Sequence, residues 1–275
     1  MLTRCKPLLG TLVEISVPEA AAGAVDRAFA AIAEVHARMS FHAEDSDLAL
    51  LRKAPPGMTV EVASETVEVL RIALDLHRES NGLFDVTIGR ELVRSGFLPR
   101  PEGPMWSRHS GTSADIEILD DRRVRCHKAI LIDLGGIAKG FAVDRAVAAL
   151  QSAGAMEGLV NAGGDLRMYG DREWVVQLRD GDGAVRTSIA LADCAIASSS
   201  NFANRRRRLD RVHTPHIGAG RSPVAVPGRV SVIADRCVMA DALTKVAIAC
   251  PETAQEMIKR YGGYILPQSD LGKAA

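Results

Sequence analysis

Residues 133–140, Asp-Leu-Gly-Gly-Ile-Ala-Lys-Gly, combine an acid, paired glycines and a lysine at a predicted strand-to-helix junction. The apolar run before Asp133 predicts a buried strand, and a helix is expected to begin near residue 138. Glycines before a helix N-terminus let backbone N–H groups approach an anion, and Lys139 adds a point charge. The pattern is neither the dinucleotide fingerprint nor the P-loop motif. Two interpretations stay open: a phosphate or nucleotide site, or a tight turn with a solvent-facing lysine.

A second pair of glycines occurs in residues 161–165, Asn-Ala-Gly-Gly-Asp, after the next predicted strand. Such a pair marks either a bulge or hairpin turn, or a loop that approaches a ligand. Two glycine-rich strand ends separated by one helix can face the same crevice, which favours a ligand site there. Residues 81–87 also end a helix, and they form either a cap with a buried Phe84 or a loop that brings Asp85 to a pocket.

The elements that position these motifs mix helices and strands without steady strand-helix-strand alternation, which favours an α+β fold with largely antiparallel sheets. Apolar residues at steps of three and four predict several helices. One begins after Pro18, and another runs from the N-cap Ser64 to a C-terminal cap at residues 81–82. The others are expected at 48–53, 138–152, 238–249 and 252–260. Strands are predicted at 10–17, 116–119, 124–126, 130–133, 158–160, 166–169, 174–179, 185–191, 230–234 and 264–266, with a hairpin turn at 180–183.

The composition excludes several classes of protein. The 275 residues are 47% hydrophobic and 25% charged, which is too apolar for intrinsic disorder as the main state. No run of about 18 apolar residues occurs, so we expect no membrane span. Lys+Arg and Asp+Glu both number 34, and the resulting net charge of zero argues against broad binding to nucleic acid or to an anionic membrane.

The cysteines and the first residues bear on the compartment. The 5 cysteines are widely spaced and contain no C-x-x-C pair, so we expect free thiols rather than zinc ligands or a disulfide framework. The first residues lack the apolar stretch of a secretory signal. We therefore expect a cytoplasmic protein, or a periplasmic one if a leader has been removed.

A series of short motifs follows in a fixed order along the chain: residues 9–11 (Leu-Gly-Thr), 45–47 (Asp-Ser-Asp), 82–89 (Gly-Leu-Phe-Asp-Val-Thr-Ile-Gly), 133–144, 161–165 and 240–242 (Ala-Asp-Ala). In type and order they resemble the motifs of the FAD:protein FMN transferase family (ApbE type). The match is almost letter for letter over residues 133–144. The resemblance implies an ApbE-like, T-fold-related α+β architecture and a single domain over residues 1–275.

The same resemblance implies an enzyme that binds FAD and Mg²⁺ and moves FMN to a Thr or Ser hydroxyl of an acceptor flavoprotein. The residues it assigns to the flavin nucleotide are Leu9, His42, Leu83, Phe84, Asp85, Asp133, Lys139 and Ser199. For the metal it assigns the carbonyl of Gly136 and the carboxylate of Asp241, and Thr244 is the candidate for a hydroxyl ligand beside them. His216 is the candidate base near the acceptor hydroxyl, and its other interpretation is a surface-loop histidine beside His213.

The chain departs from the family pattern at three places. His42 stands where the family has a tyrosine, although it or Phe41 can still stack on the flavin ring. The loop after His216 is shorter than the family's and lacks its aspartate. Lys245 stands where a threonine is expected, one helical turn after Asp241. It is interpreted either as an ordinary Asp–Lys helix pair or as an occupant of the metal's position. A third possibility is that metal still binds and Thr244, one residue earlier, supplies the hydroxyl instead.

These departures leave other functions open. One alternative is a flavin-binding maturation factor or FAD pyrophosphatase of the same family that has lost transfer. Another rests on residues 205–208, four consecutive arginines that would meet RNA or an acidic partner. A solvated loop tip is the simpler interpretation of that run, because the net charge of the chain is zero.

Overall fold

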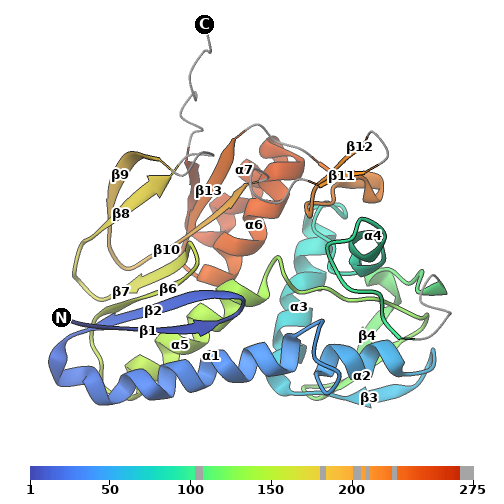
Figure 1. Ribbon diagram of the computed structural model, residues 1–275, viewed down its shortest axis with the longest axis horizontal. Helices are drawn as coiled ribbons and strands as arrows, with labels where there is room; N and C mark the ends of the chain where they lie inside the picture. Colours follow the sequence, from blue (N-terminus) through green and yellow to red (C-terminus); the bar gives the residue numbers. More distant parts are fainter. Residues whose placement is uncertain (103–107, 180–183, 201–205, 209–210, 225–227, 267–275) are drawn as a thin grey trace, which may run out of the picture.

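The largest sheet in the computed structural model has seven strands, ordered β1-β2-β6-β7-β10-β13-β14 and antiparallel throughout (Figure 1). The structure describes residues 1–102, 108–179, 184–200, 206–208, 211–224 and 228–266. In sheet order the strands span Leu2–Leu8, Thr11–Val17, Gly158–Ala162, Asp165–Tyr169, Ala195–Ser200, Arg229–Ala234 and Tyr264–Leu266.

Both faces of this sheet are covered. Because side chains alternate along a strand, Tyr169 of β7 joins the large core under the helices, and its neighbour Met168 joins a smaller cluster on the opposite face. The helices on the first face are α1 (Val25–Met39), α5 (Ala138–Ser152) and α6 (Cys237–Ala249), and α7 (Pro251–Ile258) packs on α6. The hairpin of β8 (Trp174–Arg179) and β9 (Val185–Leu191) covers the second face through Val176 and Leu191.

A second group of elements lies beyond the ends of α1 and α5, on the right of Figure 1. It contains the sheet β3-β5-β4 (Thr59–Glu61, Arg123–Cys126, Ile116–Ile118) and the helices α2 (Asp47–Lys53), α3 (Ser64–Glu79) and α4 (Gly89–Arg94). The ribbon of β11 (Arg206–Arg208) and β12 (Arg211–His213) lies near α4. The buried Asp47 ties α2 to α3, since its carboxylate accepts from Thr66 Oγ1 at 2.6 Å and from Ala63 N at 2.9 Å.

The predicted α+β architecture with antiparallel sheets is confirmed, and several boundaries need correction. Residues 130–132 are buried and Asp133 is partly buried, but they form no strand. Only two backbone hydrogen bonds join them to a neighbouring segment: Asp133 N to Val86 O at 2.8 Å and Gly89 N to Leu131 O at 3.1 Å. Ser64 is the first residue of α3 and Ala63 is its N-cap. The segment after Pro18 begins as a 3₁₀ helix, Glu19–Ala24, before α1.

Two of the strands that the sequence analysis missed, β1 and β10, lack an apolar alternation. Strand β1 is exposed over most of its length, and β10, Ala-Ile-Ala-Ser-Ser-Ser, consists mainly of small residues. Both form because an apolar neighbour pairs with them: β2 pairs with β1 over the whole of its length, and β13 pairs with β10. The formation of β1 and β10 therefore depends on pairing with neighbouring strands rather than on the intrinsic strand preference of their residues.

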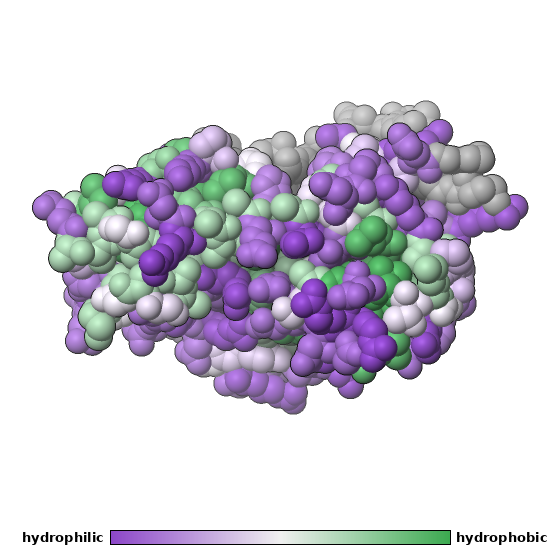
Figure 2. Space-filling model, turned by 90° about the horizontal axis from the view of Figure 1, so that it is seen from below, coloured by the Kyte–Doolittle hydropathy of each residue, from purple (hydrophilic) through white to green (hydrophobic). Residues whose placement is uncertain are grey.

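The surface seen from below is mainly polar (Figure 2). Apolar residues on that face form separate patches rather than one continuous area. Large hydrophobic side chains with high exposure are scattered along the chain, for example Leu12 in β2 and Val175 in β8. Singly exposed apolar residues of this kind are normal on protein surfaces. No helix within the described ranges is both long enough and apolar enough to cross a lipid bilayer.

Candidate functional site

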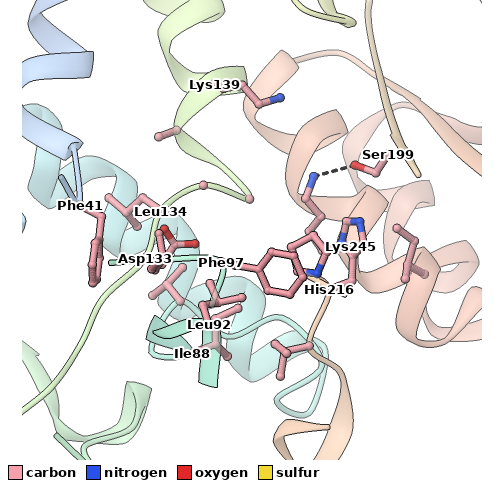
Figure 3. A pocket seen from close by; sticks show the side chains of 18 of the residues that line it. Phe41, Ile88, Leu92, Phe97, Asp133, Leu134, Lys139, Ser199, His216 and Lys245 are labelled. Atoms are coloured by element: carbon pink, nitrogen blue, oxygen red, sulfur yellow. Dashed lines mark hydrogen bonds between the residues drawn. The ribbon is translucent and has the colours of Figure 1, made fainter. Parts of the chain in front are cut away.

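A cavity of about 770 Å³ lies where the large sheet and its helices meet the second group of elements (Figure 3). The turn after β1, the end of α1, residues 83–88, residues 133–139, the end of β10, residues 215–217 and α6 all contribute to its wall. In Figure 3 the two sides of the cavity differ: one side carries Phe41, Leu134, Ile88 and Leu92, and the other carries Lys139, Ser199, His216 and Lys245. Its size is in the range of sites that hold small molecules and cofactors.

The glycines of residues 133–140 allow two close approaches. A Cβ on Gly140 would lie 2.3 Å from the carbonyl oxygen of Cys237, so only glycine lets α5 and α6 pack this closely. The N–H of Gly140 then donates to Asp241 Oδ2 at 3.1 Å. Gly136 lies under the side chain of Lys245, since a Cβ there would be 3.3 Å from the Lys245 Cγ. The motif thus joins the two helices as well as lining the cavity.

The second glycine pair forms the β6–β7 hairpin turn, with φ of +64° at Gly163 and +103° at Gly164. Residues other than glycine rarely adopt such angles in succession. The turn places Asp165 at the start of β7, where its buried carboxylate forms an ion pair with Lys139. Gly163 lines the same cavity as Gly135 and Gly136. The prediction that both glycine-rich turns face one crevice is therefore confirmed.

Lys245 is the centre of a cluster of oxygen atoms at the wall of the cavity. Its Nζ donates to Asp241 Oδ1 at 2.7 Å, to Ser199 Oγ at 2.8 Å and to Thr244 Oγ1 at 2.9 Å. The carbonyl oxygen of Asp241 is 3.3 Å away. Ser199 and Thr244 also contact each other, at 2.8 Å between their hydroxyl oxygens. The cluster thus links β10 to α6 through one ammonium group.

Burial and neighbouring charges shift the pKa values of Asp241, Asp165 and Lys139. Burial favours the neutral form of Asp241, but Lys245 and Lys139 outweigh it and hold the pKa of Asp241 below its usual value. Burial raises the pKa of Asp165 to about 6, and the nearby charge of Asp241 adds to this rise. Burial alone would lower the pKa of Lys139, but Asp241 and Asp165 raise it. Lys139 is therefore charged at neutral pH.

His216 lies beside this cluster on the cavity wall (Figure 3). Burial and then the positive charge of Lys245 lower its pKa to about 4, against the opposing effects of a hydrogen bond with the Ser200 backbone and of Asp241. The imidazole is therefore neutral at pH 7 and is able to accept a proton. Its own backbone is fixed, because the carbonyl of His216 accepts from Val224 N at 2.9 Å.

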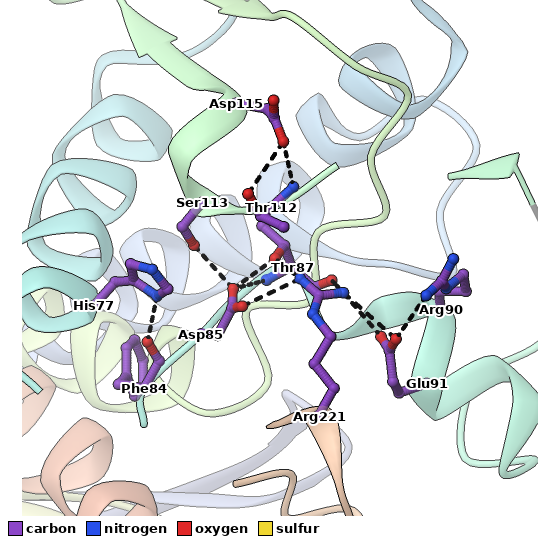
Figure 4. A network of polar contacts seen from close by, with 10 residues as sticks. All are labelled: His77, Phe84, Asp85, Thr87, Arg90, Glu91, Thr112, Ser113, Asp115 and Arg221. Carbon is purple, nitrogen blue, oxygen red and sulfur yellow. Dashed lines mark hydrogen bonds and ion pairs between the residues drawn. The ribbon is translucent and has the colours of Figure 1, made fainter. Parts of the chain in front are cut away.

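Arg221 connects the loop after His216 to residues 85–91 (Figure 4). Its guanidinium donates to Asp85 Oδ2 at 3.2 Å, to Thr87 Oγ1 at 2.7 Å and to Glu91 Oε2 at 3.3 Å. The other oxygen of Asp85 accepts from Ser113 Oγ at 2.9 Å. The half-buried side chain of Arg221 therefore holds the loop that follows His216 against the opposite wall of the cavity.

Comparison with known proteins decides the family. A model of the ApbE family matches residues 9–265. The chain belongs to the ApbE family. The crystal structure of the ApbE protein of Thermotoga maritima is 26% identical in sequence, with a TM-score of 0.83 over 96% of this chain and 93% of that one. The apo flavinyl transferase ApbE of Pseudomonas stutzeri shares the fold, at 19% identity and a TM-score of 0.79 over 98% of this chain and 94% of that one.

Two curated relatives are named FAD:protein FMN transferase. That of Rhodobacter capsulatus is 30% identical over 86% of this chain and 49% of its own length. That of Haemophilus influenzae is 29% identical over 63% of this chain and 56% of its own length. This ApbE-family chain thus spans about half the length of these two curated relatives.

In this ApbE-family chain the cavity brings together most of the residues that the sequence resemblance singled out. The cavity wall includes Leu9, His42, Leu83, Phe84, Asp85, Asp133, Gly136, Lys139, Ser199 and His216. Asp241 and Thr244 are fully buried behind this wall, and they reach it only through Lys245 and Ser199. Their roles, and those of the lining residues, stay predictions.

The residues expected to hold Mg²⁺ in this ApbE-family chain do not fit a divalent cation. Gly136, Asp241 and Thr244 surround the side chain of Lys245, whose ammonium already contacts the oxygens a hard cation would use. Among the described residues there is no group of three or more His, Cys, Asp or Glu side chains that could hold a metal. The predicted Mg²⁺ stays a prediction that this arrangement does not support.

Sequence reasoning missed three contributors to the site. Arg221 gave no local signal, because its partners are more than 100 residues away. Asp165 was noted only as part of a turn, although it forms the ion pair with Lys139. Asp144 belongs to the long matching motif, and its carboxylate accepts from Cys237 N and Val238 N at 2.9 Å each, which caps α6 from another helix.

The arginine run at residues 205–208 is only partly described. Arg205 lies outside the described residues. Arg206 lines the cavity, stands over the Phe97 ring at 4.9 Å and donates to the carbonyl of Gly96. At this position the run therefore contributes to the wall of the candidate site.

Proposed function

We propose that this protein transfers FMN from FAD to a hydroxyl group of an acceptor protein. The hydroxyl oxygen attacks the phosphorus on the FMN side of the FAD diphosphate, and the P–O bond to AMP breaks. The products are a phosphoester between FMN and the acceptor, and AMP. The single observation that carries the proposal is the cavity in which both glycine-rich turns of the ApbE-family chain meet two lysine ammonium groups.

The polar side of the cavity supports binding of the diphosphate. Lys139 and Lys245 both line it, and their carboxylate partners Asp165 and Asp241 are buried behind them. An anion that enters therefore meets the positive ends of two ion pairs. Charge-assisted contacts of this kind are stronger than neutral hydrogen bonds, and they stabilise the extra negative charge that develops on the phosphate oxygens during transfer.

The apolar side of the cavity supports binding of the flavin ring. Phe41 and Phe84 are nearly buried in its wall, next to Leu134. An isoalloxazine ring gains free energy from burial against such side chains and from contact with their aromatic faces. His42, which is more exposed, lies at the rim beside Phe41. The cavity thus offers an apolar site and a cationic site to the two ends of the FMN half of FAD.

His216 is proposed as the base that takes the proton of the acceptor hydroxyl. Its imidazole is neutral at pH 7, because burial and Lys245 lower its pKa to about 4. The neutral ring accepts the proton as the new P–O bond forms, and it releases the proton to solvent afterwards. When bound, a divalent cation would neutralise phosphate charge in such a reaction. The proposal assigns this task to the two lysines of the cavity.

The test incubates the protein with FAD and a purified flavoprotein domain that carries a modifiable Thr or Ser. The expected result is covalent flavin fluorescence on the acceptor in a denaturing gel, with one AMP released for each flavin attached. The matched variant is His216→Asn, which keeps a polar side chain of similar reach but cannot take up the proton. We expect it to bind FAD and to label the acceptor at least about 100-fold more slowly.

Two other outcomes have defined meanings. Release of FMN and AMP in equal amounts without labelling of a verified acceptor indicates FAD pyrophosphatase activity, and it contradicts the transfer proposal. Binding of FAD with neither product indicates a flavin-binding maturation factor and contradicts it equally. Two departures from the family pattern motivate these alternatives: Lys245 on α6 and the shortened loop after His216.

A further inference from the structure

We propose that the ammonium group of Lys245 takes the place of a divalent metal ion, so that this protein binds the diphosphate of its nucleotide without metal. The inference rests on the proposed function for the identity of the nucleotide. The metal-free character of the site rests on Lys245 and its oxygen contacts alone.

The first support is the coordination of the Lys245 nitrogen. Three oxygen atoms lie within 2.7 to 2.9 Å of it, from Asp241, Ser199 and Thr244, and the backbone oxygen of Asp241 lies at 3.3 Å. A buried carboxylate, a carbonyl and two hydroxyls are the types of ligand that bind hard cations in proteins. The structure therefore contains a cation site, and the cation in it belongs to the chain.

The second support is the space around the site. The stem of Lys245 lies across Gly136, where an added Cβ would be 3.3 Å from Cγ and 3.4 Å from Cε. Asp241 and Thr244 have no exposed surface. A metal ion could reach their oxygens only after the ammonium had left, because two positive charges about 3 Å apart repel each other strongly in a poorly solvated site.

The third support is the direction in which the charges face. The side chain of Lys245 is 21% exposed and that of Lys139 is 33% exposed, whereas Asp241 and Asp165 are 0% and 2% exposed. The cations therefore face the cavity, and their anions lie behind them. A diphosphate that binds there meets two positive charges at fixed positions, which is the electrostatic task of a divalent cation.

The decisive test measures metal binding without nucleotide. Mn²⁺ is titrated into the wild-type protein and followed by electron paramagnetic resonance, with Mg²⁺ as a competitor. We expect no Mn²⁺ site in the wild type below about 1 mM. Lys245→Thr removes the ammonium and keeps the surrounding oxygens, so it should gain one Mn²⁺ site that Mg²⁺ displaces. Lys259→Thr, at an exposed lysine of the 3₁₀ helix Lys259–Tyr261, is the matched control and should gain none.

A second measurement follows FAD binding by quenching of flavin fluorescence. Wild-type affinity should be the same within about twofold in EDTA and in Mg²⁺. Lys245→Met keeps the length of the side chain without its charge, and it should weaken FAD binding roughly tenfold under both conditions. Lys245→Thr should bind FAD weakly in EDTA and recover affinity in Mg²⁺. Circular dichroism checks that each variant is folded.

Several results would overturn the inference. They are a Mg²⁺-competitive Mn²⁺ site in the wild type, a loss of FAD affinity in EDTA, or a folded Lys245→Thr variant that gains no metal site. Each is read without any transfer reaction. Absence of flavin transfer would therefore contradict the proposed function and leave the result for the Lys245 site intact.

Discussion

Arg221 and Asp85 are joined by a guanidinium–carboxylate contact of 3.2 Å across 136 residues of sequence. Arg221 has a φ of +57°, an unusual value for a residue with a side chain. The loop accepts this conformation while the guanidinium reaches Asp85, Thr87 and Glu91 together. The contact holds the segment that follows His216 in place, and it joins the two walls of the cavity.

Replacement of Arg221 by alanine should loosen that loop. It leaves the half-buried carboxylates of Asp85 and Glu91 without their shared cation, so we expect a loss of roughly 1–3 kcal/mol in the free energy of unfolding. Thermal unfolding should therefore shift down by several degrees, and FAD affinity should fall several-fold. Arg78→Ala, at an exposed arginine of α3, is the control. Equal melting temperatures for both variants would refute the role of Arg221.

Gly140 should tolerate no side chain. An alanine there would place its Cβ 2.3 Å from the Cys237 carbonyl oxygen and 2.9 Å from the Asp241 Cβ, so α5 and α6 would have to separate. We expect Gly140→Ala to lower the free energy of unfolding by about 3 kcal/mol or more. Gly23→Ala is the matched control, because an added Cβ at that exposed position meets nothing within 4 Å. Denaturant unfolding measures both, and a Gly140→Ala variant as stable as wild type would contradict the packing argument.

Sequence patterns correctly predicted the elements whose formation depends on residues within a single segment. The apolar stripes of α1 and α3 and the alternation in β2 arise from single segments, and the Asn81–Gly82 cap is present, with φ of +51° and +81°. Strand β10 could not be predicted in this way, because its small residues form a strand only beside β13. Residues 130–133 were expected as a strand because they are apolar, but only two backbone hydrogen bonds join them to a neighbouring segment, so no strand forms.

The candidate site shows the same division. Both glycine-rich turns were predicted, because glycine pairs have a local conformational meaning. The interpretation of Lys245 as a helix pair with Asp241 is confirmed, and the same ammonium group also contacts Ser199. Only the fold shows this, since Ser199 lies 46 residues away in sequence. Arg221 depends on contacts of longer range still, and no local pattern indicates them.

Asp133 should make stability fall as pH rises through its pKa. Burial raises the pKa of Asp133 to about 6, above the usual 3.8, although Gly135 and His42 oppose the rise. The folded state thus binds more protons than the unfolded state between about pH 4 and 6, so this stabilisation is complete below pH 4 and lost above pH 6. Asp133→Asn lacks the titrating carboxyl group, so its stability should not show this pH dependence. Between pH 4 and 6 the free energy of unfolding of wild type should fall by roughly 2 kcal/mol relative to that of Asp133→Asn.

Chemical denaturation at pH 4, 5, 6 and 7 checks this difference. Asp171→Asn, at an exposed aspartate outside the cavity, serves as the control and should track wild type at every pH. The comparison is of each variant with wild type at the same pH, because Asp165 and His216 also titrate in this range and contribute equally to both. A constant difference between wild type and Asp133→Asn would show that Asp133 titrates normally.

The loss of activity at low pH should follow the protonation of His216. Its neutral form is the proposed base, and its pKa is about 4 because burial and then Lys245 disfavour the imidazolium. Asp133 and Asp165 titrate near pH 6 in wild type and in His216→Asn alike, so the ratio of their kcat/KM values for FAD isolates His216. Protonation removes the base, so this ratio should stay level as pH falls from 7 to about 5 and drop only near pH 4. In Lys245→Met the repelling charge is gone, and the drop should move to higher pH. A histidine titration by NMR in the free protein gives the same pKa without turnover. A His216 pKa near 6.5 in wild type would contradict both its burial and its proximity to Lys245.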